Sequence, residues 1–188
     1  RTFMDEGSVV SGWKRYPVHK SVIKSRDEVL NNDNDNVKTS FKPLQTGATF
    51  EFKLRYHNLR PMELGALVSA ITFHNKDEHF HSIGSGKPLG YGKVEVNLKN
   101  KDLYVQYLKN FEAYMNAALK FKSAKWHEQE QIIDLLAMSK EQNNKGESTL
   151  DYMKLKNTNG ENEYVSAKNQ NEYLKRYSDL ENIESESG

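Results

Sequence analysis

The sequence predicts an α+β fold in which an antiparallel sheet carries packed helices and is followed by a helical extension. Three observations predict it. Along residues 48–58 apolar side chains alternate with charged ones, which is typical of a strand with one buried face. Apolar residues then recur at helical spacing from residue 61 onward. A glycine-rich loop and a second alternating stretch, residues 93–98, follow, so the local order is strand, helix, loop, strand.

Residues 37–44 and 48–58 flank Thr46 and Gly47, a pair typical of a turn, and together they predict a hairpin. In the second arm the apolar positions are Phe50, Phe52, Leu54 and Tyr56, and the polar positions are Glu51, Lys53, Arg55 and His57. Because successive side chains of a strand point to opposite faces, we expect one face to be buried and the other to be charged.

The helix after this strand is expected to begin at Pro61, whose fixed backbone angle suits a first helical position, and to end near Phe73. Its apolar stripe consists of Met62, Leu64, Leu67, Val68 and Ile71. Gly65 and Ala66 are small, so they are expected to let the helix pack closely on the sheet.

A second helix is predicted from Asp102, a plausible N-cap, to about Phe121. Its apolar face holds Tyr104, Leu108, Phe111, Met115 and Ala118, at spacings of four and three. Ser123 is expected to cap a third helix, which has Trp126, Ile133, Leu136 and Ala137 on one side. Residues 171–180 predict a short helix as well.

Other segments complete the organisation of the chain. Residues 8–19 predict an edge strand that leads into a loop near Pro17, and the polar run at residues 31–36 predicts a mobile loop. We therefore expect three parts, namely a core at residues 1–100, a helical extension at residues 101–140, and a polar, acidic and partly disordered tail at residues 141–188.

Composition narrows the classes of protein to which the chain can belong. It has 188 residues, 36% of them hydrophobic, and no cysteine, which excludes disulfides and thiolate metal sites and fits a reducing cytoplasm. No apolar run approaches the roughly 20 residues that span a bilayer, so a membrane partner is not expected. The sequence begins at Arg1, and we expect it to be a portion of a longer protein.

The net charge of +1 conceals an uneven distribution. Residues 141–188 hold six basic and ten acidic side chains, a net charge of −4, so the first 140 residues carry +5. Between residues 38 and 60 the sequence has five basic residues and a single acidic residue, Glu51. A basic body favours a polyanionic partner, although a solvated surface explains the same charges.

The stretch SIGSGKPLGYGK, residues 82–93, is the most informative loop of the sequence. It is not a Walker A loop, because Pro88 follows Lys87 and a strand rather than a helix comes next. It is not a dinucleotide fingerprint either, because that motif lies between a strand and a following helix. Two interpretations remain, a tight structural crossover and a phosphate-binding loop, in which Lys87 and Lys93 add charge and Tyr91 stacks on a base.

Several blocks of the sequence resemble the RAMP superfamily of CRISPR-associated proteins. They are residues 52–59, 61–67 and 81–94, with an upstream block at residues 12–19 similar to the type III branch. The resemblance covers residues 12–19 and 47–98, about a third of the chain. One βαβ-like half is recognisable, which is why we expect the C-terminal portion of a longer RAMP protein.

The resemblance implies a ferredoxin-like, RRM-like domain and a subunit that holds guide RNA in a type III effector complex for antiviral defence. Its implied partners are guide RNA and neighbouring effector subunits, and it implies no cofactor. From the resemblance and the basic strand face together, the expected RNA-binding residues are Lys53, Arg55, His57, His81, Gly84, Gly86, Lys87, Gly90, Tyr91, Gly92 and Lys93. The residues of the glycine-rich loop take this role from the family.

Other functions remain open at this point. A metal-independent endoribonuclease that matures CRISPR RNA would pair His19, His57 or His81 with Lys87. An assembly subunit would contact other subunits and no RNA. No motif identifies Asp33 or Asp35 as catalytic, so no catalytic residue is assigned.

The histidines at positions 74, 79 and 81 cluster in sequence, with Asp77 and Glu78 between them. Imidazole and carboxylate groups suit a metal such as zinc or nickel, but the spacing matches no standard site, and we expect no metal. We favour the interpretation that His81 forms a hydrogen bond that positions the glycine-rich loop.

Overall fold

The computed structural model describes residues 6, 15–22, 41–119, 125–142, 160–170, 172 and 177. The predicted mobile loop at 31–36, the capping Ser123, the first part of the predicted edge strand and nearly all of the predicted helix at 171–180 lie outside these residues. The helices are α1 Pro61–Thr72, α2 Val105–Ala118, α3 Glu130–Ser139 and α4 Glu163–Gln170. The strands are β1 Val18–His19, β2 His81–Ser82, β3 Lys93–Val94 and β4 Glu141–Gln142. Short 3-10 helices occupy Lys87–Leu89, Lys101–Tyr104 and Trp126–Glu128.

Helix α1 confirms the predicted helix at both ends. Pro61 is its first residue, and Phe73 ends it in the left-handed conformation with a φ of 50°. At the start, the Arg60 backbone N–H donates to a Glu63 carboxylate oxygen at 2.8 Å, which satisfies a donor that the helix cannot use. The chain therefore enters and leaves α1 at well-defined positions.

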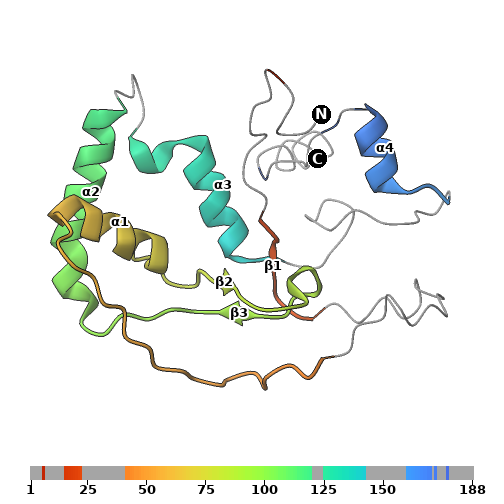
Figure 1. The fold of residues 1–188 in the computed structure, drawn as a ribbon, viewed down its shortest axis with the longest axis horizontal. Coiled ribbons are helices and arrows are strands. Elements are labelled where there is room, and N and C mark those ends of the chain that lie inside the picture. Colours follow the sequence, from red (N-terminus) through yellow and green to blue (C-terminus); the bar gives the residue numbers. More distant parts are fainter. Residues whose placement is uncertain are drawn as a thin grey trace, which may run out of the picture.

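The core of the described chain lies between α1 and α2, which cross one another in Figure 1. Leu64, Val68 and Leu108 are its buried centre, and Leu67, Leu98, Tyr104 and Tyr107 pack around them. Gly65 allows this approach, because a Cβ there would lie 1.9 Å from the Tyr107 carbonyl oxygen. The expectation that Gly65 packs on a sheet is thus corrected, since its neighbour is the backbone of another helix.

Helix α2 also differs from its prediction in how it begins. The Lys101–Tyr104 turn is a 3-10 helix, and Tyr104 is the N-cap of α2, so Asp102 lies one turn earlier and does not cap it. Trp126 of the next 3-10 turn is buried, whereas Ile133 of α3 is 51% exposed. The apolar face predicted for the third helix therefore contributes Trp126 to the core and leaves Ile133 at the surface.

Two small sheets connect distant parts of the chain. Strands β2 and β3 pair antiparallel, with His81 opposite Val94 and Ser82 opposite Lys93. Strands β1 and β4 pair in parallel, with Val18 opposite Glu141. The mixture of helices with a small antiparallel sheet agrees with the α+β class. Of the alternating stretch at 93–98, only Lys93–Val94 forms a strand.

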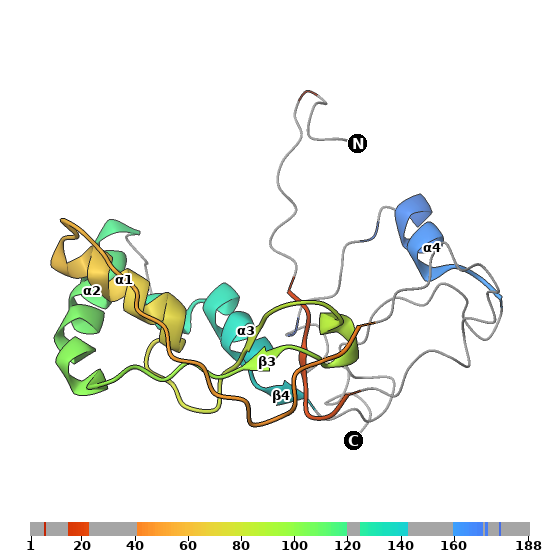
Figure 2. The same cartoon turned by 60° about the horizontal axis from the view of Figure 1, so that its bottom comes forward.

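Residues 48–58 do not form the strand that their alternation predicts. The turn at Thr46 and Gly47 is present, and Ala48 N donates to Gln45 O at 3.2 Å. Beyond it the chain runs as an extended arm along one side of the molecule, drawn in orange in Figures 1 and 2, and no described segment pairs with it. The prediction of a buried face is wrong for the described chain, because no second strand or helix covers this arm.

Across the described helices, none has the length and apolar character that crossing a membrane would require.

Candidate nucleic-acid interface at the glycine-rich loop

The glycine-rich loop is a tight reversal between β2 and β3. Ile83 N donates to Gly92 O at 2.8 Å, which closes its base, and Leu89 N and Tyr91 N donate to Gly86 O at 2.9 and 3.2 Å. The four glycines at positions 84, 86, 90 and 92 have φ angles of 85°, 71°, 89° and 74°. Glycine adopts this left-handed region without the clash that a Cβ causes, so the loop requires glycine for its backbone path.

Three of these glycines also lie too close to other groups to carry a side chain. A Cβ at Gly92 would lie 1.8 Å from Ile83 O, and one at Gly90 would lie 2.8 Å from Ser21 O. A Cβ at Gly86 would meet the rings of Phe41 and Tyr91, each at 2.9 Å. The structural interpretation of the loop therefore accounts for Gly86, Gly90 and Gly92.

Gly84 is different, because it lies at the exposed tip of the loop. A Cβ at this position would meet nothing within 4 Å. The backbone N–H groups of Gly84, Ser85 and Gly86 donate to no other described residue. Lys87 extends over the same tip, where its Nζ donates to Gly84 O at 2.7 Å. The tip thus presents unused backbone donors beside an ammonium group, which is the chemistry that binds phosphate oxygens.

Lys93 and Tyr91 have partners within the protein. The Lys93 ammonium forms an ion pair with Glu141 and lies 5.2 Å from the centre of the Phe80 ring. Tyr91 packs edge-on against Phe41, with ring centres 5.2 Å apart. Both residues therefore tie the loop to other segments, β4 for Lys93 and the start of the extended arm for Tyr91.

His81 holds the loop to helix α1. Its Nε2 donates to Ile71 O at 2.7 Å, and its ring lies 4.4 Å from the Phe73 ring, centre to centre. Because a carbonyl oxygen only accepts, the ring proton must be on Nε2. The expected positioning hydrogen bond of His81 is confirmed.

Lys53, Arg55 and His57 form a second basic element on the extended arm. All three are exposed, and none forms a hydrogen bond or ion pair with another described residue. Their neighbour Glu51 is neutralised by Lys99, at 2.5 Å. The described contacts of the loop reach Phe41, His19 and Ser21, and they do not join it to these three side chains.

The other two histidines of the cluster in sequence, His79 and His74, lie within the protein and are at least partly buried. His79 is buried and its Nδ1 donates to Asp77 O at 2.7 Å, whereas His74 Nδ1 lies 3.1 Å from Ser69 Oγ. Burial lowers the pKa of both imidazoles, and the nearby cations Lys76 and Lys140 lower the pKa of His79 further. Within the described ranges no three histidine, aspartate or glutamate side chains gather as a metal site would require.

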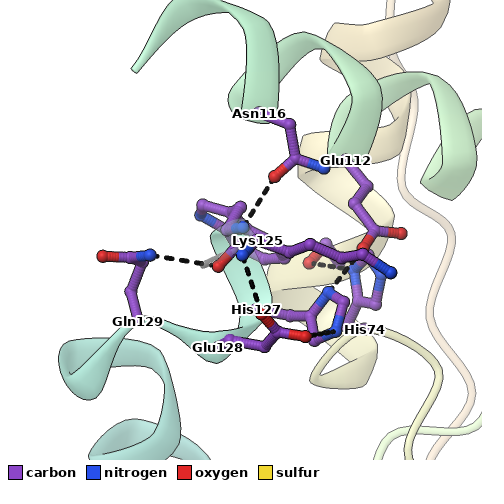
Figure 3. Close-up of polar contacts among 9 residues, drawn as sticks. His74, Glu112, Asn116, Lys125, His127, Glu128 and Gln129 are labelled. Atoms are coloured by element: carbon purple, nitrogen blue, oxygen red, sulfur yellow. Dashed lines mark hydrogen bonds and ion pairs between the residues drawn. The ribbon is translucent and has the colours of Figure 1, made fainter. Parts of the chain in front are cut away.

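Sequence reasoning missed a polar cluster that joins α2 to the turn before α3 (Figure 3). Glu112 of α2 accepts a hydrogen bond from His127 Nδ1, and Asn116 Oδ1 accepts one from Trp126 N at 2.6 Å. Glu112 and Asn116 are four residues apart and share one face of α2, which is the one signal that the sequence holds. The cluster fixes the Trp126–Glu128 turn against α2.

Arg15 was missed as well. Its Nη2 donates to Phe80 O at 2.6 Å, and its guanidinium carbon lies 5.3 Å from the centre of the Phe73 ring. Burial lowers the pKa of this guanidinium. Arg15 thereby connects the segment before β1 to the residues that precede β2.

An open hollow of about 500 Å³ lies beside α3. Its lining residues are Lys76, His79, His127, Ile133, Leu136, Ala137, Lys140, Glu141 and Tyr177. None of the residues expected to bind RNA lines it, so the loop tip and the basic residues of the arm remain the candidate interface.

No family model matches the chain, and no curated protein or solved structure matches it either.

Proposed function

We propose that this chain binds single-stranded guide RNA as a subunit of a type III CRISPR effector complex in the cytoplasm, in antiviral defence. The proposal includes neighbouring effector subunits as partners and a ferredoxin-like fold for the core at residues 1–100. It rests on the resemblance of the sequence blocks and on the chemistry of the loop.

The observation that carries the proposal is the tip of the glycine-rich loop. Gly84 leaves open space above the backbone, the N–H groups of Gly84, Ser85 and Gly86 have no described partner, and Lys87 lies beside them. A purely structural crossover requires the packed glycines of this loop, but it does not require an exposed tip with unused donors. Phosphate oxygens accept hydrogen bonds from backbone N–H groups and attract the ammonium.

The basic residues of the arm support the same function. Lys53 and Arg55 are exposed without an acidic partner among the described residues, so they can neutralise phosphates. The charge of +5 on the first 140 residues favours such a partner too.

The experiment is a titration of a labelled single-stranded RNA of mixed sequence, followed by fluorescence anisotropy at several salt concentrations. Lys87→Ala and the double variant Lys53→Ala/Arg55→Ala should each weaken binding. Each phosphate contact that is lost should lower the slope of log affinity against log salt by about 0.7. Lys87→Arg should retain the slope, because it retains the charge.

Lys109→Ala is the matched control, because Lys109 is an exposed lysine on α2 and belongs to neither element. Unchanged affinity and slope in the loop and arm variants would refute the proposed interface. Cleavage of the RNA in the presence of EDTA would instead identify a metal-independent endoribonuclease.

A further inference from the structure

The extended arm, residues 48–58, carries an apolar face that no described helix or strand covers. Phe50, Phe52, Leu54 and Tyr56 are 73%, 61%, 47% and 52% exposed. They alternate with polar residues, so in an extended chain all four side chains lie on one side. Folded proteins rarely leave a contiguous apolar row of this size in water, and such rows mark interaction surfaces.

The backbone of the arm is equally unpartnered. No N–H or C=O group of residues 49–59 forms a hydrogen bond with another described backbone group. Within the described chain both edges of the arm are therefore open, and an extended backbone with open edges is a template for another strand. A second strand satisfies the alternating donors and acceptors along such an edge, and its side chains pack beside those of the arm on the same face.

The arm is held in this conformation by contacts at its ends and in its middle. Phe41 packs against Tyr91 before it, and the hydrogen bond from Ala48 N closes the turn at its start. Lys99 pairs with Glu51 near its middle, and the left-handed Asn58, with a φ of 54°, directs the chain into α1. A segment that is anchored at both ends loses less conformational entropy on binding than a free peptide does, which favours a docking role.

The charges on the polar face select the partner. Lys53 and Arg55 project from it without acidic partners among the described residues. In a second copy of this chain, antiparallel pairing centred on Leu54 would set Lys53 opposite Arg55. Like charges directly opposite one another destabilise a strand pair, so a partner strand that sets acidic side chains opposite Lys53 and Arg55 is favoured over this self-pairing.

We propose that residues 48–58 dock a β-strand of another protein chain in which apolar residues alternate with acidic ones. The partner strand pairs with the open backbone edge, and its apolar side chains pack beside the Phe50–Tyr56 row on the same face. Its acidic side chains lie beside Lys53 and Arg55. This protein interface is separate from the loop tip, but it shares Lys53 and Arg55 with the proposed RNA interface, so a bound strand and RNA compete for these two side chains.

The probe is a synthetic peptide, acetyl-Val-Glu-Val-Glu-Val-Glu-Val-amide, titrated into the 188-residue chain by calorimetry. Two matched peptides carry lysine in place of glutamate, or N-methyl groups on every residue, which remove the backbone donors of both edges. The glutamate peptide should bind at least tenfold more tightly than the lysine peptide, and the N-methylated peptide should not bind.

A charge-swapped variant of the protein tests the same contacts from the other side. Lys53→Glu/Arg55→Glu should reverse the preference and bind the lysine peptide more tightly. Phe52→Ser/Leu54→Ser should lose binding of both peptides, whereas Lys109→Glu on α2 should leave it unchanged. All four arm residues are exposed, so circular dichroism of the variants should match that of the parent protein.

Three results would overturn the proposal. The first is equal affinity of the parent protein for the glutamate and lysine peptides. The second is a dimer in sedimentation experiments that Phe52→Ser/Leu54→Ser abolishes, because the occupant would then be a second copy. The third is loss of RNA affinity in Phe52→Ser/Leu54→Ser without any peptide binding by the parent, because the apolar row would then serve RNA.

Discussion

Gly84 differs from the other loop glycines because a side chain there would meet open space. Its φ of 85° still disfavours most residues, at a cost of about 1–2 kcal/mol, and asparagine and aspartate tolerate this region best. Gly84→Asn and Gly84→Asp should therefore fold alike, while the aspartate should repel phosphates at the tip. We expect Gly84→Asp to bind single-stranded RNA at least fivefold more weakly than Gly84→Asn at low salt, measured by anisotropy. Equal affinity of the two variants would remove the tip from the interface.

Gly65 is a second residue whose environment determines the effect of a substitution. In an open helix, alanine in place of glycine stabilises by about 1 kcal/mol. Here the added Cβ would lie 1.9 Å from the Tyr107 carbonyl oxygen and 2.8 Å from the Phe111 Cβ, so α1 and α2 must separate. Gly65→Ala should lower the free energy of unfolding by about 1–3 kcal/mol in urea titrations.

The exposed Ala70→Ser on the same helix is the control for Gly65→Ala, and it should change the free energy of unfolding by less than about 0.5 kcal/mol. A Gly65→Ala protein as stable as the parent would mean that α1 and α2 pack less closely than described.

Buried histidines make stability depend on pH. Burial lowers the pKa of His79 and of His74, so in the folded protein each binds its proton less readily than in the unfolded chain. Their contribution to stability is therefore complete above the unfolded value of about 6.5 and is lost as the pH falls towards the folded values. Between pH 7 and 5.5, His79→Gln should show a smaller fall in the free energy of unfolding than the parent.

The comparison for His79→Gln is Ala70→Ser, an exposed substitution on α1 that changes no titratable group and should retain the fall of the parent protein. Chemical unfolding at four pH values would provide the slopes. A slope in His79→Gln that equals the parent's would show that His79 is not buried as described.

The residue types of the glycine-rich loop predicted its backbone conformation, but they did not predict the partners of its side chains. Closely spaced glycines predict unusual backbone angles and close approaches, and both are present. The partner of Lys93 is Glu141, 48 residues later, and the partner of His127 is Glu112 on another helix. Such pairs have no local pattern, so the sequence could not show that Lys93 is occupied or that the Glu112 cluster exists.

At the scale of elements, the helices were predictable because each carries its own periodic signal. The stripes on α1 and α2 meet each other, and Pro61 and Phe73 delimit α1. Alternation along residues 48–58 likewise indicates that one face of the segment is apolar and the other polar, but it does not indicate which part of the protein packs on the apolar face. No described helix or strand packs on this face. For this reason periodicity predicted the helices correctly, whereas alternation predicted a buried strand that does not form.

Trp126 links α3 to the α1–α2 pair. Its ring lies 4.9 Å from Phe111 in an edge-to-face contact and 5.2 Å from the His74 ring, centre to centre. Because Trp126 is only 9% exposed, its side chain is not available for contact with a neighbouring subunit. Trp126→Ala should lower the free energy of unfolding by about 3–5 kcal/mol, and Trp126→Phe should lower it less.

Leu103→Ala is the control for Trp126→Ala, because Leu103 is 67% exposed and its loss should cost less than about 0.5 kcal/mol. Urea unfolding followed by circular dichroism would measure both. If Trp126→Ala were as stable as Leu103→Ala, the attachment of the Trp126 turn to α2 would be wrong.

At the scale of the whole molecule, the exposed chemistry divides into two surfaces. The loop tip offers backbone donors and Lys87, and the arm offers an apolar row, an open backbone and two cations. The α1–α2 core supports both, because His81 ties the loop to α1 and Arg60 begins α1 where the arm ends. RNA at the loop and a protein strand on the arm would together describe a subunit of a larger assembly.

The most direct measurement is ultraviolet crosslinking of single-stranded RNA to the 188-residue chain, with the crosslinked peptides located by mass spectrometry. The account predicts crosslinks within residues 82–93, and a second set on the arm beside Lys53 and Arg55. Crosslinks confined to α2 and α3, or none at protein concentrations that saturate the RNA, would contradict the claim that the glycine-rich loop binds RNA.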